Sequence, residues 1–190
     1  MPIKAGLESS FFNYQGWGIV SKILYNFRSM ISLNDIYIRT SLQPGDIGTV
    51  IQMHGSMYND EKHYGVGFEV YVAEGLCEFY RRYDAVKDRV WVAEHNNRIV
   101  GFLLCMHRGD AAQLRYFLID PQYRGIGLGK KLMELFMEFL GSRSCYLWTT
   151  NELPAAAALY RKFGFEVVEE KPSTGFGKPV IEQKYERKGG

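Results

Sequence analysis

Apolar positions recur along this chain with two different periods, and each period predicts one type of element. A period near 3.6 residues, typical of amphipathic helices, predicts helices over 46–57, 68–83, 128–140 and 153–163. Short apolar runs bounded by turn residues predict strands over 36–42, 90–94, 99–106, 114–119, 145–149, 165–168 and 180–185. The predicted order is therefore strand, two helices, three strands, helix, strand, helix and two strands.

This order of elements predicts the fold class and the domain organisation. Helices interleaved with a three-stranded meander indicate an α/β fold, of the α+β kind with a mixed central sheet flanked by helices. Residues 36–187 should form one domain. Residues 1–35 are expected to be an N-terminal extension, with a short amphipathic helix over 19–31.

The segment 120–130 is the most informative stretch, because it joins a strand to a helix through a basic, glycine-rich loop. Its sequence is Asp-Pro-Gln-Tyr-Arg-Gly-Ile-Gly-Leu-Gly-Lys. The first turn of a helix has unpaired backbone N–H groups, which bind anions. Glycine lets the backbone approach a ligand closely because it has no Cβ atom, and Arg124 adds a positive charge. The loop therefore predicts a pyrophosphate site.

Composition narrows the classes of function. The net charge of +2 and the scattered basic residues argue against nucleic acid as a partner. No run is long and apolar enough to cross a membrane, and the first residues do not follow the order of a signal peptide. Cys77, Cys105 and Cys145 show neither disulfide nor zinc-ligand spacing. We therefore expect a cytoplasmic protein with reduced thiols, no metal and no membrane partner.

Two motifs resemble signatures of the GNAT superfamily of N-acetyltransferases. The signature for coenzyme A, Arg/Gln-x-x-Gly-x-Gly/Ala, corresponds to Arg124, Gly127 and Gly129. The second signature, Ala-x-x-x-Tyr followed by Gly-Phe, corresponds to Ala156, Tyr160 and the pair Gly164-Phe165. The resemblance covers 36–185 in element order and implies the GNAT-like acyl-CoA N-acyltransferase fold. More narrowly, the tracts 42–61, 147–150 and 167–177 resemble acetyltransferase domains fused to MarR-type regulators. Residues 1–35 are too short for a winged helix, so DNA binding is not carried over.

The resemblance implies acetyl-CoA as the co-substrate and a small-molecule or peptide amine as the acceptor, which attacks directly in a ternary complex. In the family, the loop holds the pyrophosphate, and the preceding strand splays from its neighbour and pairs with the pantetheine arm. The residues implied for this binding are Phe117, Leu118, Ile119, Arg124, Gly125, Ile126, Gly127, Leu128, Gly129, Lys130 and Asn151. Asn151 lies two residues before the position, Leu153 here, where many members have asparagine.

The resemblance says less about the catalytic residues than about the residues that bind the coenzyme. Tyr160 matches the family's tyrosine that faces the coenzyme sulfur, which implies a general acid for the departing thiolate; the alternative is that Tyr160 only packs the last helix. The general base is not fixed. Glu61, in the expected loop 58–67, is the favoured candidate, with Glu69 and Glu94 as others, although any of them could be a surface carboxylate. The loop aromatics Tyr58 and Tyr64, with Phe68, could line the acceptor pocket.

Two other functions stay open. A dinucleotide-dependent oxidoreductase would use Gly125 and Gly127, but Lys130 occupies the third glycine position of its Gly-x-Gly-x-x-Gly motif. A non-catalytic acyl-CoA-binding sensor or regulatory module would keep the loop without turnover. The terminal hairpin strands could also mediate a homodimer.

Overall fold

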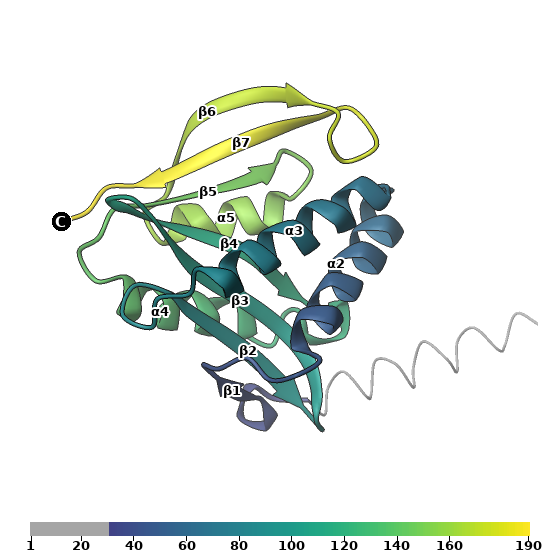
Figure 1. Cartoon of the computed structure of the whole chain (residues 1–190), viewed down its shortest axis with the longest axis vertical. Helices are drawn as coiled ribbons and strands as arrows, with labels where there is room; N and C mark the ends of the chain where they lie inside the picture. Colours follow the sequence, from purple (N-terminus) through teal and green to yellow (C-terminus); the bar gives the residue numbers. More distant parts are fainter. Residues whose placement is uncertain (1–30) are drawn as a thin grey trace, which may run out of the picture. The chain divides into compact units, whose positions relative to one another are not determined.

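One seven-stranded mixed sheet organises residues 31–190, the part of the chain that the computed structural model describes (Figure 1). Its strand order is β1-β2-β3-β4-β5-β7-β6, with β4 and β5 parallel and the other neighbours antiparallel. The strands are β1 (Tyr37–Arg39), β2 (Arg89–His95), β3 (Arg98–Arg108), β4 (Ala111–Ile119), β5 (Cys145–Thr150), β6 (Glu166–Ser173) and β7 (Val180–Arg187). The predicted mixed sheet is confirmed.

Four α-helices and two short 3-10 helices complete this part of the chain. They are α2 (Asp46–Lys62), α3 (Val66–Arg81), α4 (Leu128–Leu140), α5 (Pro154–Lys162), η1 (Leu33–Asp35) and η2 (Pro121–Tyr123). The compact unit runs from Leu33 to Gly190. The helix predicted over 19–31 lies outside the described residues except for its last position, as does most of the extension predicted over 1–35.

The helices cover both faces of the sheet (Figure 1). Val90 and Val92 of β2 belong to the core cluster under α2 and α3. Trp91, between them in sequence, points to the other face and packs against Phe136 of α4, with ring centroids 5.9 Å apart. Because both faces are buried, these central strands are continuously apolar rather than alternating.

Helix α2 is longer than the sequence predicted. It continues to Lys62, so the first half of the loop expected over 58–67 is helical, and α3 takes its last two residues. The helix ends at His63, whose left-handed backbone (φ 59°) lets its N–H reach the Asn59 carbonyl. The prediction was wrong because the segment 58–62 is polar and aromatic, but it contains no glycine or proline to break a helix. Tyr58 and Glu61 are therefore held on a rigid helix.

Strands β4 and β5 separate soon after they meet. Only Ala112 and Gln113 of β4 pair with β5, through Cys145 and Tyr146. A bulge in β4 lies at Tyr116, which has a left-handed backbone (φ 54°), and the register with β3 shifts at the same place. The expected splay is present. On the side of β4 that faces β5, residues 114–119 therefore have no strand partner within residues 31–190, although β3 pairs with their other side.

Candidate active site

The glycine-rich loop presents the start of helix α4 as an open anion site. Gly127 is the N-cap residue, with φ 94° and ψ −3°, and no side chain caps the helix. The Lys131 N–H bonds to the Gly127 carbonyl, so the preceding N–H groups at Leu128, Gly129 and Lys130 have no carbonyl one turn earlier in the helix. A Cβ atom at Gly127 would meet nothing closer than Leu33 Cδ2 at 3.9 Å. This geometry fits a phosphate group, and only glycine adopts the conformation without strain.

A cleft runs from this loop along β4 to α5. Eight of the residues predicted to bind the coenzyme line it: Phe117, Leu118, Ile119, Arg124, Gly125, Gly127, Gly129 and Lys130. Ile126 and Leu128 do not belong to the lining, and Leu128 is buried in the core. Asn151 is held away from the cleft: its N–H bonds to the Ile181 carbonyl, and its side chain borders a different depression.

Arg124 is paired with Glu61. The two guanidinium Nη atoms lie 3.0 and 2.8 Å from the Glu61 carboxylate, and Nε donates to the Ile119 carbonyl at 3.1 Å. Both side chains border the cleft. The arginine predicted to bind the pyrophosphate and the glutamate predicted as the base are therefore in direct contact. The other two candidate bases line neither this cleft nor the cavity described next. Glu94 pairs with Arg39, and Glu69 lies against Gly55 of α2.

A second cavity lies between the sheet and helices α2 and α3. Its walls are mainly aromatic, and they include the predicted pocket residues Tyr58, Tyr64 and Phe68 together with Tyr71, Tyr116 and Phe176. The β6–β7 loop supplies Phe176, whose carbonyl accepts a hydrogen bond from the Gly65 N–H at 2.9 Å. The loop is thereby tied to the turn between α2 and α3, beside the cavity.

The two cavities share five lining residues, which mark the place where they meet: Tyr58, Phe117, Leu153, Ala156 and Tyr160. Tyr160 is 5% exposed, and burial raises the pKa of its phenol above the ordinary value of 10.0. Burial also raises the pKa of Tyr58 to about 12. Both hydroxyls therefore stay protonated at neutral pH and can donate a hydrogen bond to a group at the junction.

Several cavity residues escaped the sequence analysis. His54, Gln113, Arg115 and Tyr116 line the second cavity, but none belongs to a recognisable motif. Arg115 and Tyr116 are consecutive in β4, and regular alternation would place only one of them on the α3 side. The bulge at Tyr116 brings both to that side. The one signal that could have indicated these residues was the charged Arg115 within the otherwise apolar run 114–119.

Comparison with known proteins identifies the family. The family model described as "Acetyltransferase (GNAT) domain" matches residues 86–167. Glucosamine 6-phosphate N-acetyltransferase of Trypanosoma brucei brucei is 31% identical over 98 residues, which cover 48% of this chain and 67% of that protein. The chain belongs to the GNAT acetyltransferase family. The uncharacterised N-acetyltransferase YjgM of Escherichia coli is 36% identical over 101 residues, covering 50% of this chain.

The solved structures agree on the fold. A GNAT-family acetyltransferase from Staphylococcus aureus superposes with a TM-score of 0.62 at 21% identity, covering 80% of this chain and 98% of the other. The predicted GNAT-like acyltransferase fold is thus confirmed. The chain matches only part of the length of several relatives: 60% of YjgM, and 37% and 41% of two further proteins. Within residues 31–190, no helix combines the length and apolarity needed to span a membrane, and no three potential metal-ligating side chains cluster.

Proposed function

We propose that this GNAT protein transfers the acetyl group of acetyl-CoA to a primary amine, which attacks the thioester directly in a ternary complex. The observation that carries the proposal is the meeting of two cavities at Tyr160. One contains the glycine loop and the free edge of β4, and the other is lined mainly by aromatic side chains. The name of the trypanosome relative, which specifies N-acetylation of glucosamine 6-phosphate, supports an amine acceptor.

The cleft matches the three parts of acetyl-CoA in order. The N–H groups at the start of α4 suit the pyrophosphate. The unpaired edge of β4 at Phe117 and Leu118 suits the amides of the pantetheine arm, as in the addition of a peptide to a sheet edge. The thioester would then lie near Tyr160, where the cleft meets the aromatic cavity.

The chemistry places two requirements on the protein. An alkylamine has a pKa of about 10.4, so it must lose a proton before its nitrogen can attack the thioester carbon. As the C–N bond forms, the C–S bond breaks and negative charge develops on sulfur. The buried Tyr160 hydroxyl keeps its proton and can donate a hydrogen bond to that sulfur, which lowers the energy of the transition state.

Glu61 is our proposal for the base that receives the amine proton, directly or through water. Its carboxylate is bound by Arg124 in this structure, so the guanidinium occupies both of its oxygens. A pyrophosphate at the loop would compete with Glu61 for the guanidinium of Arg124. Coenzyme binding would then release the carboxylate at the moment when a base is needed.

The test combines coenzyme binding with turnover. Calorimetry with acetyl-CoA, coenzyme A and NAD identifies the ligand, and thiol release across an amine panel measures transfer. Tyr160→Phe should lower kcat by about a hundredfold or more, with little change in the Kd for acetyl-CoA. Tyr185→Phe is the matched control, because it removes a neighbouring buried hydroxyl that lines neither cavity.

The alternatives give different results. Binding of acetyl-CoA without thiol release for any amine would support the sensor, and binding of NAD alone would support the oxidoreductase. Loss of coenzyme affinity in Tyr160→Phe with an unchanged rate for the bound complex would refute the role assigned to this tyrosine. A homodimer, a cytoplasmic location and the absence of a nucleic-acid partner stay predictions.

A further inference from the structure

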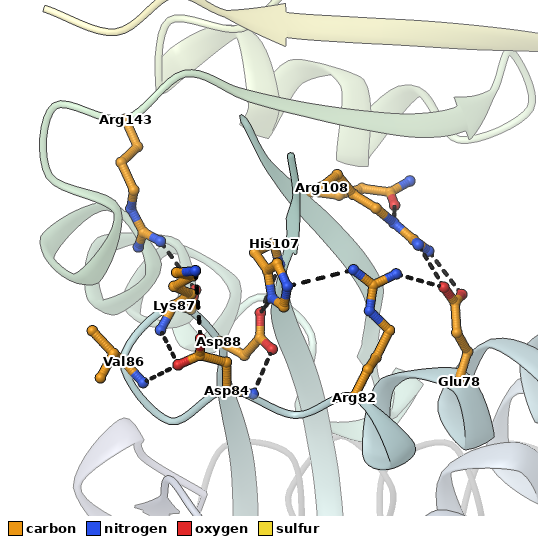
Figure 2. A network of polar contacts seen from close by, with 10 residues as sticks. Glu78, Arg82, Asp84, Val86, Lys87, Asp88, His107, Arg108 and Arg143 are labelled. Carbon is orange, nitrogen blue, oxygen red and sulfur yellow. Dashed lines mark hydrogen bonds and ion pairs between the residues drawn. The ribbon is translucent and has the colours of Figure 1, made fainter. Parts of the chain in front are cut away.

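Three arginines surround a single carboxylate, that of Glu78, in the last turn of helix α3. The Glu78 carboxylate accepts hydrogen bonds from Arg108 Nη1 and Nη2, at 2.5 and 2.8 Å, and from Arg82 Nη1, at 3.0 Å (Figure 2). Arg115 Nη1 lies farther from it, at 3.8 Å. Hydrogen bonds from Arg108 first, and then from Arg82, lower the pKa of Glu78 to about 2. One negative charge thus faces three positive ones, and Arg115 has the weakest share of it.

Arg115 is the member of this cluster that lines the aromatic cavity. Its side chain is only 10% exposed, and its guanidinium carbon lies 5.3 Å from the ring centre of Tyr71 and 4.7 Å from that of Tyr116. Within residues 31–190 no hydrogen bond is formed by its side chain. A guanidinium has five N–H donors, and leaving donors unsatisfied in a largely buried place is costly.

The other charged groups at this cavity do not offset Arg115. Glu182 is the carboxylate in the lining, and it pairs with Lys171 at 3.7 Å. Glu152 borders the coenzyme cleft and pairs with Lys178 at 2.7 Å. His54 is neutral, because burial lowers its pKa to about 4. The most weakly compensated charge at the wall of the cavity is therefore the guanidinium of Arg115.

A second unpaired donor lies beside Arg115. The Tyr116 side chain is 8% exposed, and its hydroxyl has no hydrogen-bond partner within residues 31–190. A Cβ atom built on Gly75 would meet both the Tyr116 hydroxyl, at 1.7 Å, and Arg115 Nη2, at 3.0 Å. The two donors thus converge on one point of α3. They do so because the bulge in β4 turns two consecutive residues to the same side.

From these contacts we infer that the acceptor carries an anionic group, a carboxylate or a phosphate, which Arg115 binds within the aromatic cavity. The inference rests on the proposed function, because it concerns the acceptor side of the same site. The planar guanidinium suits either anion through paired N–H donors. Aromatic side chains line the space between Arg115 and Tyr160, so the body that links amine to anion should be apolar or aromatic.

The first experiment measures binding alone and so does not depend on turnover. Calorimetry on the full chain saturated with coenzyme A compares 3-phenylpropanoate, 2-phenylethyl phosphate and the neutral 3-phenylpropanamide. At least one anion should bind about tenfold or more tightly than the amide, and the stronger of the two identifies the anion. In Arg115→Met this preference should disappear. Arg115→Gln serves as a second variant, and thermal unfolding shows that each is folded.

Lys184→Met is the matched control, because Lys184 also lies over an aromatic ring, with Nζ 5.2 Å from the Tyr146 ring centre, and its partner Glu186 does not line the cavity. It removes the same charge but does not line the cavity, so the preference for the anion should persist. Equal affinity of the wild-type protein for anions and amide would overturn the inference. So would a preference that survives both Arg115 variants.

The second experiment uses a reacting pair, 4-(aminomethyl)phenylacetate and its amide, with acetyl-CoA and thiol detection. The acid should have the lower KM, and Arg115→Met should raise that KM to the value of the amide. Discrimination among the binding probes without any thiol release would refute the proposed transfer and leave the anion site standing. Turnover of both amines with equal KM would refute the anion site and leave the transfer standing.

Discussion

Replacing Gly127 by alanine should separate the strain of its backbone from its role in coenzyme binding. Gly127 has φ 94° and lies at the N-cap of α4. The left-handed region costs a residue with a Cβ about 1–2 kcal/mol. Because the added Cβ would meet only Leu33 Cδ2 at 3.9 Å, no clash adds to that cost. In a chain of this size, each kcal/mol lowers Tm by roughly 2–4 °C.

The chain contains a matched control at Gly45. This residue is the N-cap of α2, with φ 96° and ψ −21°, and a Cβ there would meet nothing within 4 Å. Gly45→Ala should therefore lose a similar amount of stability as Gly127→Ala. Gly45 does not line the coenzyme cleft, so its replacement should leave the Kd for acetyl-CoA nearly unchanged.

The two variants should differ in coenzyme affinity. A methyl group at Gly127 would occupy the space in front of the N–H groups of α4, and losing a hydrogen bond to a charged phosphate costs about 1.5–3 kcal/mol. Gly127→Ala should thus raise the Kd for acetyl-CoA by about tenfold or more in calorimetry. Equal changes in Kd for the two variants would show that the helix start does not hold the pyrophosphate.

Two further predictions concern buried polar groups of the second cavity. Tyr116→Phe should raise the free energy of unfolding in urea by about 1 kcal/mol, because it removes a buried hydroxyl that has no partner in the described chain. Tyr64→Phe should lower it by a similar amount, because that hydroxyl shares a 2.9 Å hydrogen bond with Thr150; the same sign for both would contradict the assignment. His54 is held neutral, with its pKa lowered from 6.5 to about 4, so its contribution is complete above pH 6.5 and declines as the pH falls toward 4. The loss should reach about 3 kcal/mol in the wild-type protein and be absent from the pH profile of His54→Gln, and identical pH profiles would refute it.

The sequence predicted most of the fold because each element carries its own local signal. Helix α4 begins and ends where its apolar period and Gly141 indicate. The short polar connection between the predicted strands 90–94 and 99–106 is a tight hairpin turn, in which Asn96 and Asn97 adopt the positive φ values that such a turn needs. The extension of α2 was missed because polar composition suits an exposed helical face as well as a loop.

The second cavity was predicted only in part, through Tyr58, Tyr64 and Phe68, because the rest of it depends on contacts between distant segments. Phe176 reaches Tyr64 from a loop more than a hundred residues later in the chain. The ion pair of Arg124 with Glu61 likewise joins a loop to the end of α2. No spacing in the sequence indicates either contact. The coenzyme side was more accessible, since loop, strand and helix follow one another directly.

The splay of β4 and β5 explains why binding and catalysis belong to the same place in this fold. A continuous ladder between the strands would close the sheet and separate the helices on its two faces. Only two residue pairs join β4 to β5, whereas six join β5 to β7, so the sheet gives up ladder hydrogen bonds at one position. Those freed backbone groups are the ones that suit an extended ligand. The gap also lets Tyr160, from one side of the sheet, border the aromatic cavity on the other. Under the proposed function, an amine and a thioester that enter from opposite faces would meet at the opening between these two strands.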